Sequence, residues 1–127
     1  MRTVDKPWGH ELIWAETPRY VGKILHIKRG EQLSLQYHRV KDETIMVLSG
    51  LLRFEHWEDG AAPGYTDLKP HEPFHIHPGL RHRMIALEDT DGDGRADRRV
   101  LRVPRYPPSS GAKLTVITYI CVYYSLG

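Results

Sequence analysis

The sequence has few cysteines, no long apolar segment and little excess positive charge, whereas the opposite features are typical of secreted, membrane and nucleic-acid-binding proteins. Its 127 residues include one cysteine, Cys121, which excludes an internal disulfide framework and fits a reducing compartment. The N-terminal stretch MRTVDKPWGHEL lacks the apolar core of a signal peptide, and the longest apolar run, TVITYICVYYSL, is about half as long as a membrane-spanning helix. The formal net charge is +2, with Lys and Arg scattered among acidic residues. We therefore expect a cytoplasmic protein with neither a nucleic-acid nor a membrane partner.

Internal repeats, low-complexity linkers and helical periodicity are also missing. Short runs rich in Val, Ile, Leu, Thr and aromatic residues alternate instead with Gly and Pro turns. The runs expected to form strands are ELIWAE, YVGKILHIK, QLSLQYH, ETIMVLS, LLRFEHW, PFHIH, HRMIAL, RRVLRV and KLTVITYICVYY. This pattern predicts one all-β domain over residues 1–127, built as a sandwich or barrel.

Histidine, in contrast, is abundant. The chain has eight, of which His71, His75, His77 and His82 fall within twelve residues. Histidine is the usual ligand for zinc, iron, copper and nickel. Clustered histidines also cap turns and line polar surfaces, so clustering alone leaves a metal site and a polar surface about equally open.

The stretch SLQYHRVKDETIMVLSG arranges donor atoms more specifically. Gln36 and His38 are two residues apart on an expected strand and project to the same side. Glu43 begins the next strand after the tight connection RVKD, so it can return beside His38. A fourth donor from a distant strand, such as His82 after a Pro-Gly turn, would close the pocket. Three or four such ligands with open positions describe a catalytic or substrate-binding metal site.

The other face of the same expected strand is apolar. It carries Leu33, Leu35 and Tyr37, whereas Ser34 shares the polar face with Gln36 and His38. A barrel with a polar pocket inside and a second sheet or subunit outside would cover both faces. We therefore expect a homodimer.

The spacing in this region resembles the first motif of the cupins. That motif places a glycine, a histidine pair one residue apart, a glutamate and a second glycine at fixed intervals. Gly30, Gln36, His38, Glu43 and Gly50 match each interval, with Gln36 in place of the first histidine. The second cupin motif is matched less fully: Gly79 and His82 keep the essential spacing, whereas His71, His77 and Ala86 stand where the family has glycine, proline and asparagine.

The branch that the chain resembles is that of small jelly-roll domains similar to type II mannose-6-phosphate isomerases. That branch commonly has glutamine at this motif position, and KPWGHE, residues 6–11, is similar to its N-terminal signature. The resemblance covers residues from about 4 to 90, whereas 91–127 diverge and are expected to add C-terminal strands. It implies a double-stranded β-helix, the cupin jelly-roll barrel.

The resemblance also implies the ligands of one divalent metal, which could be zinc, manganese, iron or nickel: Gln36, His38, Glu43 and His82. Because glutamine is a weak neutral donor, we expect weaker binding than in a three-histidine cupin. His75 and His77 alternate to one face of a strand and either enlarge this site or bind metal separately; the alternative is that they lie on the barrel rim and hydrogen-bond to backbone.

A calcium loop is an alternative to a plain turn in DTDGDGRAD. Asp89, Asp91, Asp93 and Asp97 provide oxygen donors at calcium-loop spacing, but Val100 stands where an EF-hand has its bidentate glutamate. Asp-Gly repeats are also ordinary hairpin-turn chemistry, which we favour.

Three functions follow for such a site. The first is a metal-dependent sugar-phosphate isomerase, in which a base shuttles a proton between adjacent carbons. The candidate bases are His26 and His75, with Tyr37 the weakest because it lies on the apolar face. The second is a non-catalytic module that binds a sugar or small anion through a metal anchor. The third, which the glutamine disfavours, is an iron-dependent dioxygenase.

A sugar phosphate would need cationic partners. The basic residues that flank the ligand segments are Arg39, Lys41, Arg81 and Arg83. Each of the four taken alone is more simply a solvated surface charge. The expected small-molecule partner is therefore a sugar or a sugar phosphate, with the phosphate contacts drawn from this set.

Overall fold

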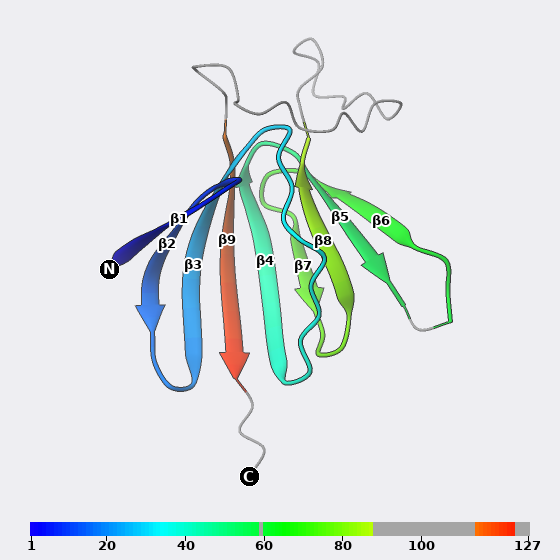
Figure 1. Ribbon diagram of the computed structural model, residues 1–127, viewed down its shortest axis with the longest axis horizontal. Helices are drawn as coiled ribbons and strands as arrows, with labels where there is room; N and C mark the ends of the chain where they lie inside the picture. The colour runs from blue at the N-terminus through cyan, green and yellow to red at the C-terminus, as the bar shows by residue number, and fades with distance from the viewer. Residues whose placement is uncertain (59, 88–113, 124–127) are drawn as a thin grey trace.

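A computed structural model describes residues 1–58, 60–87 and 114–123, and every regular element within them is a β-strand (Figure 1). The strands are β1 (Arg2–Lys6), β2 (Gly9–Glu16), β3 (Tyr20–Lys28), β4 (Lys41–Ser49), β5 (Leu52–Trp57), β6 (Gly64–Leu68), β7 (Pro73–Ile76), β8 (Arg81–Ala86) and β9 (Leu114–Tyr123). The all-β prediction is confirmed. These ranges contain no helix long and apolar enough to cross a membrane.

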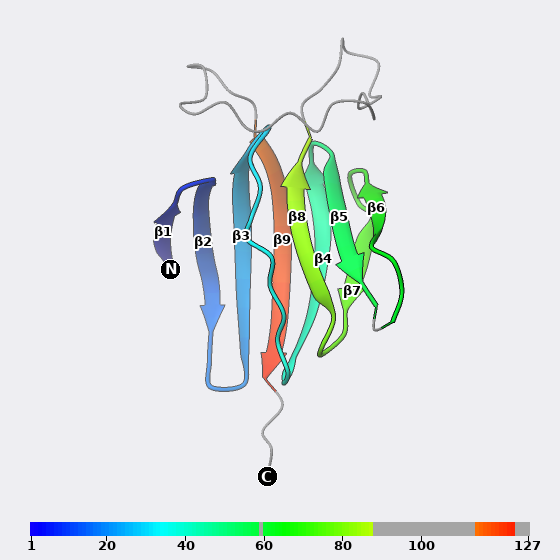
Figure 2. The ribbon, with the colours of Figure 1, turned by 45° about the vertical axis from the view of Figure 1, so that its right-hand side comes forward.

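The strands form two antiparallel sheets, which Figure 2 shows from the side. The larger sheet has the order β1-β2-β3-β9-β4-β7 and the smaller one the order β6-β5-β8. Strand β9, from the far end of the sequence, pairs with both β3 and β4. The divergent C-terminal part therefore supplies a central strand of the larger sheet.

The core lies between the sheets because inward positions alternate with outward ones along each strand. In β4, for example, Ile45 and Val47 are fully buried, and Glu43, two residues earlier on the same face, is only 2% exposed. The main core cluster comprises Trp8, Leu25, Ile27, Leu33, Ile45, Val47, Leu52, Phe54, Leu68, Ile76, Leu80, Met84, Ala86 and Ile117. A carboxylate therefore occupies a position that the pattern reserves for an apolar side chain.

The predicted strand over 32–38 is wrong. The chain here is an irregular connection from β3 to β4 that runs beside β8 and touches it through two isolated bridges, Gln32–Ile85 and Gln36–His82. The register between the two bridges differs by one residue, so the strict two-residue alternation is broken.

This irregularity changes which side chains face inward. Leu33 is buried and lies on the same side as Gln36, where both line a pocket, whereas Leu35 and Tyr37 are 54% and 46% exposed. The expected division of this segment into one polar and one apolar face therefore does not hold. The homodimer that was inferred from that division stays a prediction.

Two strands were not expected from the sequence, and one expected strand lies outside the described residues. Strand β1 forms the edge of the larger sheet and β6 the edge of the smaller one, and both are short and mostly polar. Edge strands of this kind lack the apolar run on which a strand prediction relies. The segment RRVLRV, residues 98–103, lies outside the described ranges.

The N-terminal signature has a structural role at the start of β2. Trp8 is in the main core, and its carbonyl accepts a hydrogen bond from the backbone N–H of Lys28 at 2.9 Å. Gly9 follows with φ of +151°, and a Cβ placed there would overlap the carbonyl oxygen of His26. Only glycine therefore lets β2 approach β3 at this point.

We expect Gly9→Ala to destabilise the fold by about 3–5 kcal/mol, because the methyl group meets rigid backbone at an unfavourable φ. Gly60→Ala is the matched control, since Gly60 has φ of +74° with no atom within 4 Å of the added Cβ. The control should cost only about 1–2 kcal/mol. Denaturant unfolding at equilibrium measures both, and equal losses would contradict the close-approach explanation.

Candidate metal and substrate site

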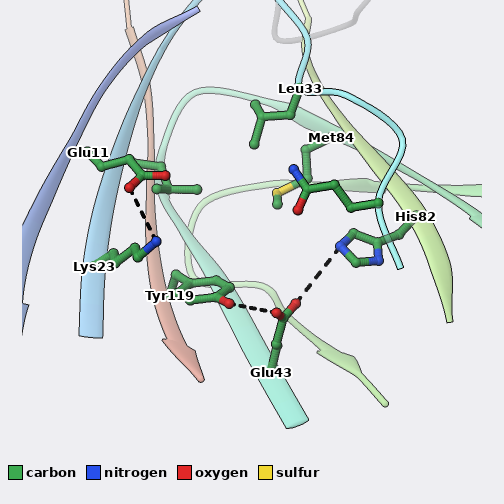
Figure 3. Close-up of a pocket in the computed structure, with 9 residues that line it drawn as sticks. Glu11, Lys23, Leu33, Glu43, His82, Met84 and Tyr119 are labelled. Carbon is green, nitrogen blue, oxygen red and sulfur yellow. Dashed lines mark hydrogen bonds and ion pairs between the residues drawn. The ribbon is translucent and has the colours of Figure 1, made fainter. Parts of the chain in front are cut away.

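A pocket opens on the inner face of the larger sheet, between that sheet and β8 (Figure 3). It encloses about 350 Å³ of space, part of which is open to solvent. The lining residues are Glu11, Lys23, Leu25, Leu33, Gln36, Glu43, His82, Met84 and Tyr119.

A backbone bridge brings Gln36 and His82 to this pocket. The N–H of each residue donates to the carbonyl of the other, both at 2.9 Å. Residues directly opposite in an antiparallel pair extend their side chains to the same side. The pairing therefore places two predicted metal donors, far apart in sequence, on one wall.

The ring of His82 is held in one orientation. Its Nδ1 lies 2.9 Å from the carbonyl oxygen of Leu80, which can only accept, so Nδ1 carries the proton. The ring is 2% exposed and stacks on Phe54 with 5.5 Å between centroids. In the neutral ring the lone pair is then on Nε2, which lies 3.9 Å from a Glu43 carboxylate oxygen. This arrangement is typical of metal-binding histidines.

Glu43 is the point on which the other groups converge. One carboxylate oxygen accepts a hydrogen bond from the Tyr119 hydroxyl at 2.6 Å and lies 3.6 Å from Nε2 of His38 (Figure 3 shows the Tyr119 contact). Burial raises the pKa of Tyr119, and the hydrogen bond to Glu43 and its charge raise this pKa further. Tyr119 is therefore a neutral donor that fixes the carboxylate.

His38 is kept neutral. Burial lowers its pKa, and the nearby Glu43 carboxylate offsets only part of this effect. The positive charges of Lys41 and Lys23 lower the pKa further. A neutral imidazole is the form that binds metals.

The four predicted ligands are of the donor types that bind a divalent metal, and the two histidine–glutamate separations are short enough for a shared ion. Two atoms that each lie about 2.1 Å from one ion are at most about 4.2 Å apart, and the His38–Glu43 and His82–Glu43 separations of 3.6 and 3.9 Å lie within that limit. Gln36 adds an amide oxygen on the same wall. In the part of the chain that is described, no three His, Cys, Asp or Glu side chains are already arranged to hold a metal. Binding would therefore require these side chains to close around the ion.

His26, a predicted candidate base, lies away from the pocket. It is on the opposite face of β3 from Lys23 and Leu25, where its ring stacks on His10 with 4.3 Å between centroids. Its buried Nδ1 has no hydrogen-bond partner among the described residues. His26 is therefore not placed to act on a molecule in the pocket.

The environment of His26 predicts a pH dependence of stability. Burial lowers its pKa from 6.5, and the charge of His10 lowers it further. The unfolded chain then binds the proton more readily, so the stabilisation from this group is present above pH 6.5 and lost as the pH falls through the folded pKa. We expect His26→Phe to lessen the decline in unfolding free energy between about pH 7 and pH 5. Urea titrations at both pH values measure it, and an unchanged decline would exclude His26 as its source.

His75 and His77, which were predicted to enlarge the metal site or to bind metal separately, are also outside the pocket. His75 pairs with Thr44, on the face of β4 opposite to Glu43, and contacts the carboxylate of Asp42. His77 is half exposed, with its Nδ1 2.9 Å from the carbonyl oxygen of Pro78. The structure therefore does not bring either residue together with the four metal donors.

Of the four predicted phosphate contacts, three point away from the pocket. Arg39 is exposed and donates to the Tyr37 hydroxyl at 2.7 Å. Arg81 and Arg83 flank His82 on β8, so they project to the other face of the smaller sheet, and Arg83 donates to Glu55 at 2.6 Å.

Lys41 is the fourth, and it shares a face of β4 with Glu43. Its ammonium lies 5.5 Å from the ring centroid of Tyr123, and it forms no ion pair with another described residue. The calcium-loop candidates Asp89, Asp91, Asp93 and Asp97 lie outside the described ranges.

Sequence reasoning missed three charged or polar residues that line the pocket: Glu11, Lys23 and Tyr119. Strand alternation in YVGKILHIK was an available signal, because Lys23 falls on the same face as the buried Val21, Leu25 and Ile27. Tyr119 could not be assigned, since nothing in the sequence indicates that β9 lies between β3 and β4.

Known structures with the same architecture are numerous. KdgF from a Halomonas species aligns over 98% of this chain and 89% of its own, with 18% identity and a TM-score of 0.65. A cupin-superfamily protein from Desulfitobacterium hafniense aligns over 90% and 76%, with 11% identity and a TM-score of 0.62. The S161A mutant of Bacillus subtilis oxalate decarboxylase OxdC aligns over 99% of this chain but 28% of its own, with 14% identity and a TM-score of 0.68. At these identities the likeness shows the fold.

The sequence itself assigns the family. No curated protein sequence matches the chain. The profile of the family described as "Mannose-6-phosphate isomerase C-terminal" matches residues 1–86, which is more than half of the chain. The resemblance inferred from the motifs is confirmed, and the protein belongs to the mannose-6-phosphate isomerase C-terminal family, with the cupin jelly-roll fold.

Proposed function

We propose that the protein is a metal-dependent sugar-phosphate isomerase of the mannose-6-phosphate type, or a close relative that acts on a small carbohydrate. Its metal ligands in this proposal are Gln36, His38, Glu43 and His82. The observation that carries the proposal is the approach of two histidine Nε2 atoms to the buried carboxylate of Glu43. Glu43, Gln36 and His82 line the pocket, whereas His38 is not a lining residue and approaches Glu43 from beside it. Membership of the family supports the choice of substrate class.

The protein's own groups set up the site before a substrate enters. The Leu80 carbonyl fixes the proton of His82 on Nδ1, and the Tyr119 hydroxyl fixes one oxygen of Glu43. Leu33 and Met84 line the pocket and exclude water from part of it. A divalent metal held by Gln36, His38, Glu43 and His82 would supply a Lewis acid for the oxygens of an open-chain sugar.

The base that moves the proton between adjacent sugar carbons must be a group that faces the pocket. His26 and His75 lie on the outer face of the larger sheet, so neither is placed to act as this base. The titratable groups that line the pocket in addition to the metal donors are Glu11, Lys23 and Tyr119. Because Tyr119 is a neutral donor to Glu43, the base is to be sought between Glu11 and Lys23.

Turnover tests this proposal. We expect protein loaded with Zn²⁺, Mn²⁺, Fe²⁺ or Ni²⁺ in parallel samples to convert mannose 6-phosphate to fructose 6-phosphate with at least one metal. The Glu43→Gln variant should be inactive, and the His77→Gln variant, altered on the surface, should keep the wild-type rate. Sugar binding without turnover would instead support a non-catalytic sugar-binding protein, and oxygen consumption with Fe²⁺ would support a dioxygenase.

A further inference from the structure

An ion pair lines the pocket on the side away from His82 (Figure 3). Lys23 Nζ lies 3.2 Å from a Glu11 carboxylate oxygen, and the two side chains are only 25% and 13% exposed. Both charged ends turn toward the space that Glu43 and His82 face from the other side. The pocket therefore has two polar ends of different chemistry.

The Glu11–Lys23 pair has hydrogen-bonding capacity left over. An ammonium has three donors; one of those of Lys23 is directed to Glu11, and the ammonium also lies 5.7 Å from the Tyr119 ring centroid. An ionised carboxylate accepts at both oxygens, and the recorded contact uses one oxygen of Glu11. The pair thus offers a donor and an acceptor side by side, which matches two adjacent hydroxyl groups.

Charge argues against a phosphate at this end. Glu11 and Glu43 carry two negative charges in the pocket, against one positive charge on Lys23. A phosphate beside Lys23 would also be beside the Glu11 carboxylate and would be repelled by it. Neutral hydroxyls carry no such cost.

A purely structural role explains the pair poorly. Glu11 and Lys23 are diagonal neighbours on β2 and β3, which the backbone register from Gly9 to Glu16 already holds together. Removing two charges from water costs free energy that their attraction often fails to recover. The exposed Arg2–Glu16 pair of the same sheet avoids this cost, since its side chains are 59% and 54% exposed.

We propose that Glu11 and Lys23 form a hydroxyl-binding subsite that takes two adjacent hydroxyls of a carbohydrate, with Lys23 donating and Glu11 accepting. This inference rests on the proposed function for the view that the pocket takes a carbohydrate. It is independent of metal identity and of turnover.

Binding of deoxy sugars tests the subsite. Calorimetric titration with mannose 6-phosphate and its monodeoxy analogues is made on the wild type and on three variants, Lys23→Met, Glu11→Met and Lys28→Met. Loss of either of two adjacent hydroxyls should weaken binding to the wild type about 10- to 100-fold. In Lys23→Met, loss of the hydroxyl that accepts from Lys23 should change the affinity less than about 3-fold, because its partner is gone, whereas the hydroxyl that donates to Glu11 should keep its penalty.

Lys28→Met is the matched control, because Lys28 is on β3 but on the face opposite to Lys23, and it should keep the wild-type pattern. Glu11→Met removes the acceptor, which glutamine would keep through its amide oxygen, and provides a second test if Lys23→Met does not fold. A full deoxy penalty at both hydroxyls in Glu11→Met, or a wild type that binds every analogue equally or none of the sugars, would overturn the subsite. Binding with the expected pattern but without turnover would overturn the isomerase proposal and leave the subsite intact.

Discussion

His82→Ala is expected to lower the affinity for the metal by about 100-fold or more. Changing a residue that only orients a ligand typically costs 10- to 100-fold, so removal of the ligand itself should cost at least as much. His82 is buried, and the Leu80 carbonyl fixes its Nδ1 proton, which leaves the Nε2 lone pair on the side of Glu43. Competition with a fluorescent chelator measures the affinity, and turnover should fall with metal content.

The control for this variant is His75→Ala. His75 is exposed on the outer face, bound to Asp42, and should be replaceable without loss of metal. Equal metal affinity of the two variants would mean that His82 is not a ligand. A larger loss in His75→Ala would place the metal on the outer face instead.

Phe54→Ala should be the most destabilising core substitution near the site, at about 3–5 kcal/mol. Phe54 is fully buried, 4.2 Å from Phe74 and 5.5 Å from His82 between ring centroids. The lost ring leaves a cavity that also frees the His82 ring, so the metal affinity should fall about 10-fold. Equilibrium unfolding without metal and chelator competition at a temperature where the variant is folded measure the two effects.

Tyr65→Ala is a matched aromatic control for Phe54→Ala. Tyr65 is 53% exposed on the neighbouring strand β6 and covers the guanidinium of Arg53, with 4.3 Å between the guanidinium carbon and the ring centroid. Its loss should cost about 1 kcal/mol and leave metal binding unchanged. A similar cost for both substitutions would show that Phe54 does not support the core as described.

The motif spacing carried most of the information that the sequence held about the site. The tight turn before β4 was sufficient to bring Glu43 near His38. The expected antiparallel pairing of 32–38 with β4 is wrong, because β4 pairs with β7 and β9 and segment 32–38 runs beside β8. The family resemblance added His82, and the backbone bridge between Gln36 and His82 explains why that residue accompanies the first motif. The placement of Glu43 depends on local spacing, whereas the inclusion of His82 depends on its long-range pairing with Gln36, for which the family resemblance stood in.

Predictions that depended on which face of a strand points inward were less accurate. His26 and His75 are candidate bases in the sequence, but the register of β3 and β4 turns both outward. Long-range strand pairing decides which face of a strand points into the core, and composition does not reveal that pairing. Leu33 shows the same limit, because the irregular path of 32–38 turns it inward beside Gln36.

The cations show why proximity in sequence is a weak guide to a binding site. Arg81 and Arg83 are adjacent to His82 in the chain, yet alternation directs them away from its pocket. Lys23 is distant from every motif residue, yet β3 and β9 bring it close enough to influence the pKa of His38. The pocket is assembled across strands, so its second wall could be recognised only from the fold.

The central claim is that one divalent metal binds among Gln36, His38, Glu43 and His82. Anomalous diffraction from crystals grown with the metal, collected above and below its absorption edge, tests this claim most directly. The account predicts one strong anomalous peak within coordination distance of Glu43 and both histidines, with the amide of Gln36 turned toward it. A pocket without such a peak, or a peak beside His75 or His77 on the outside, would contradict it.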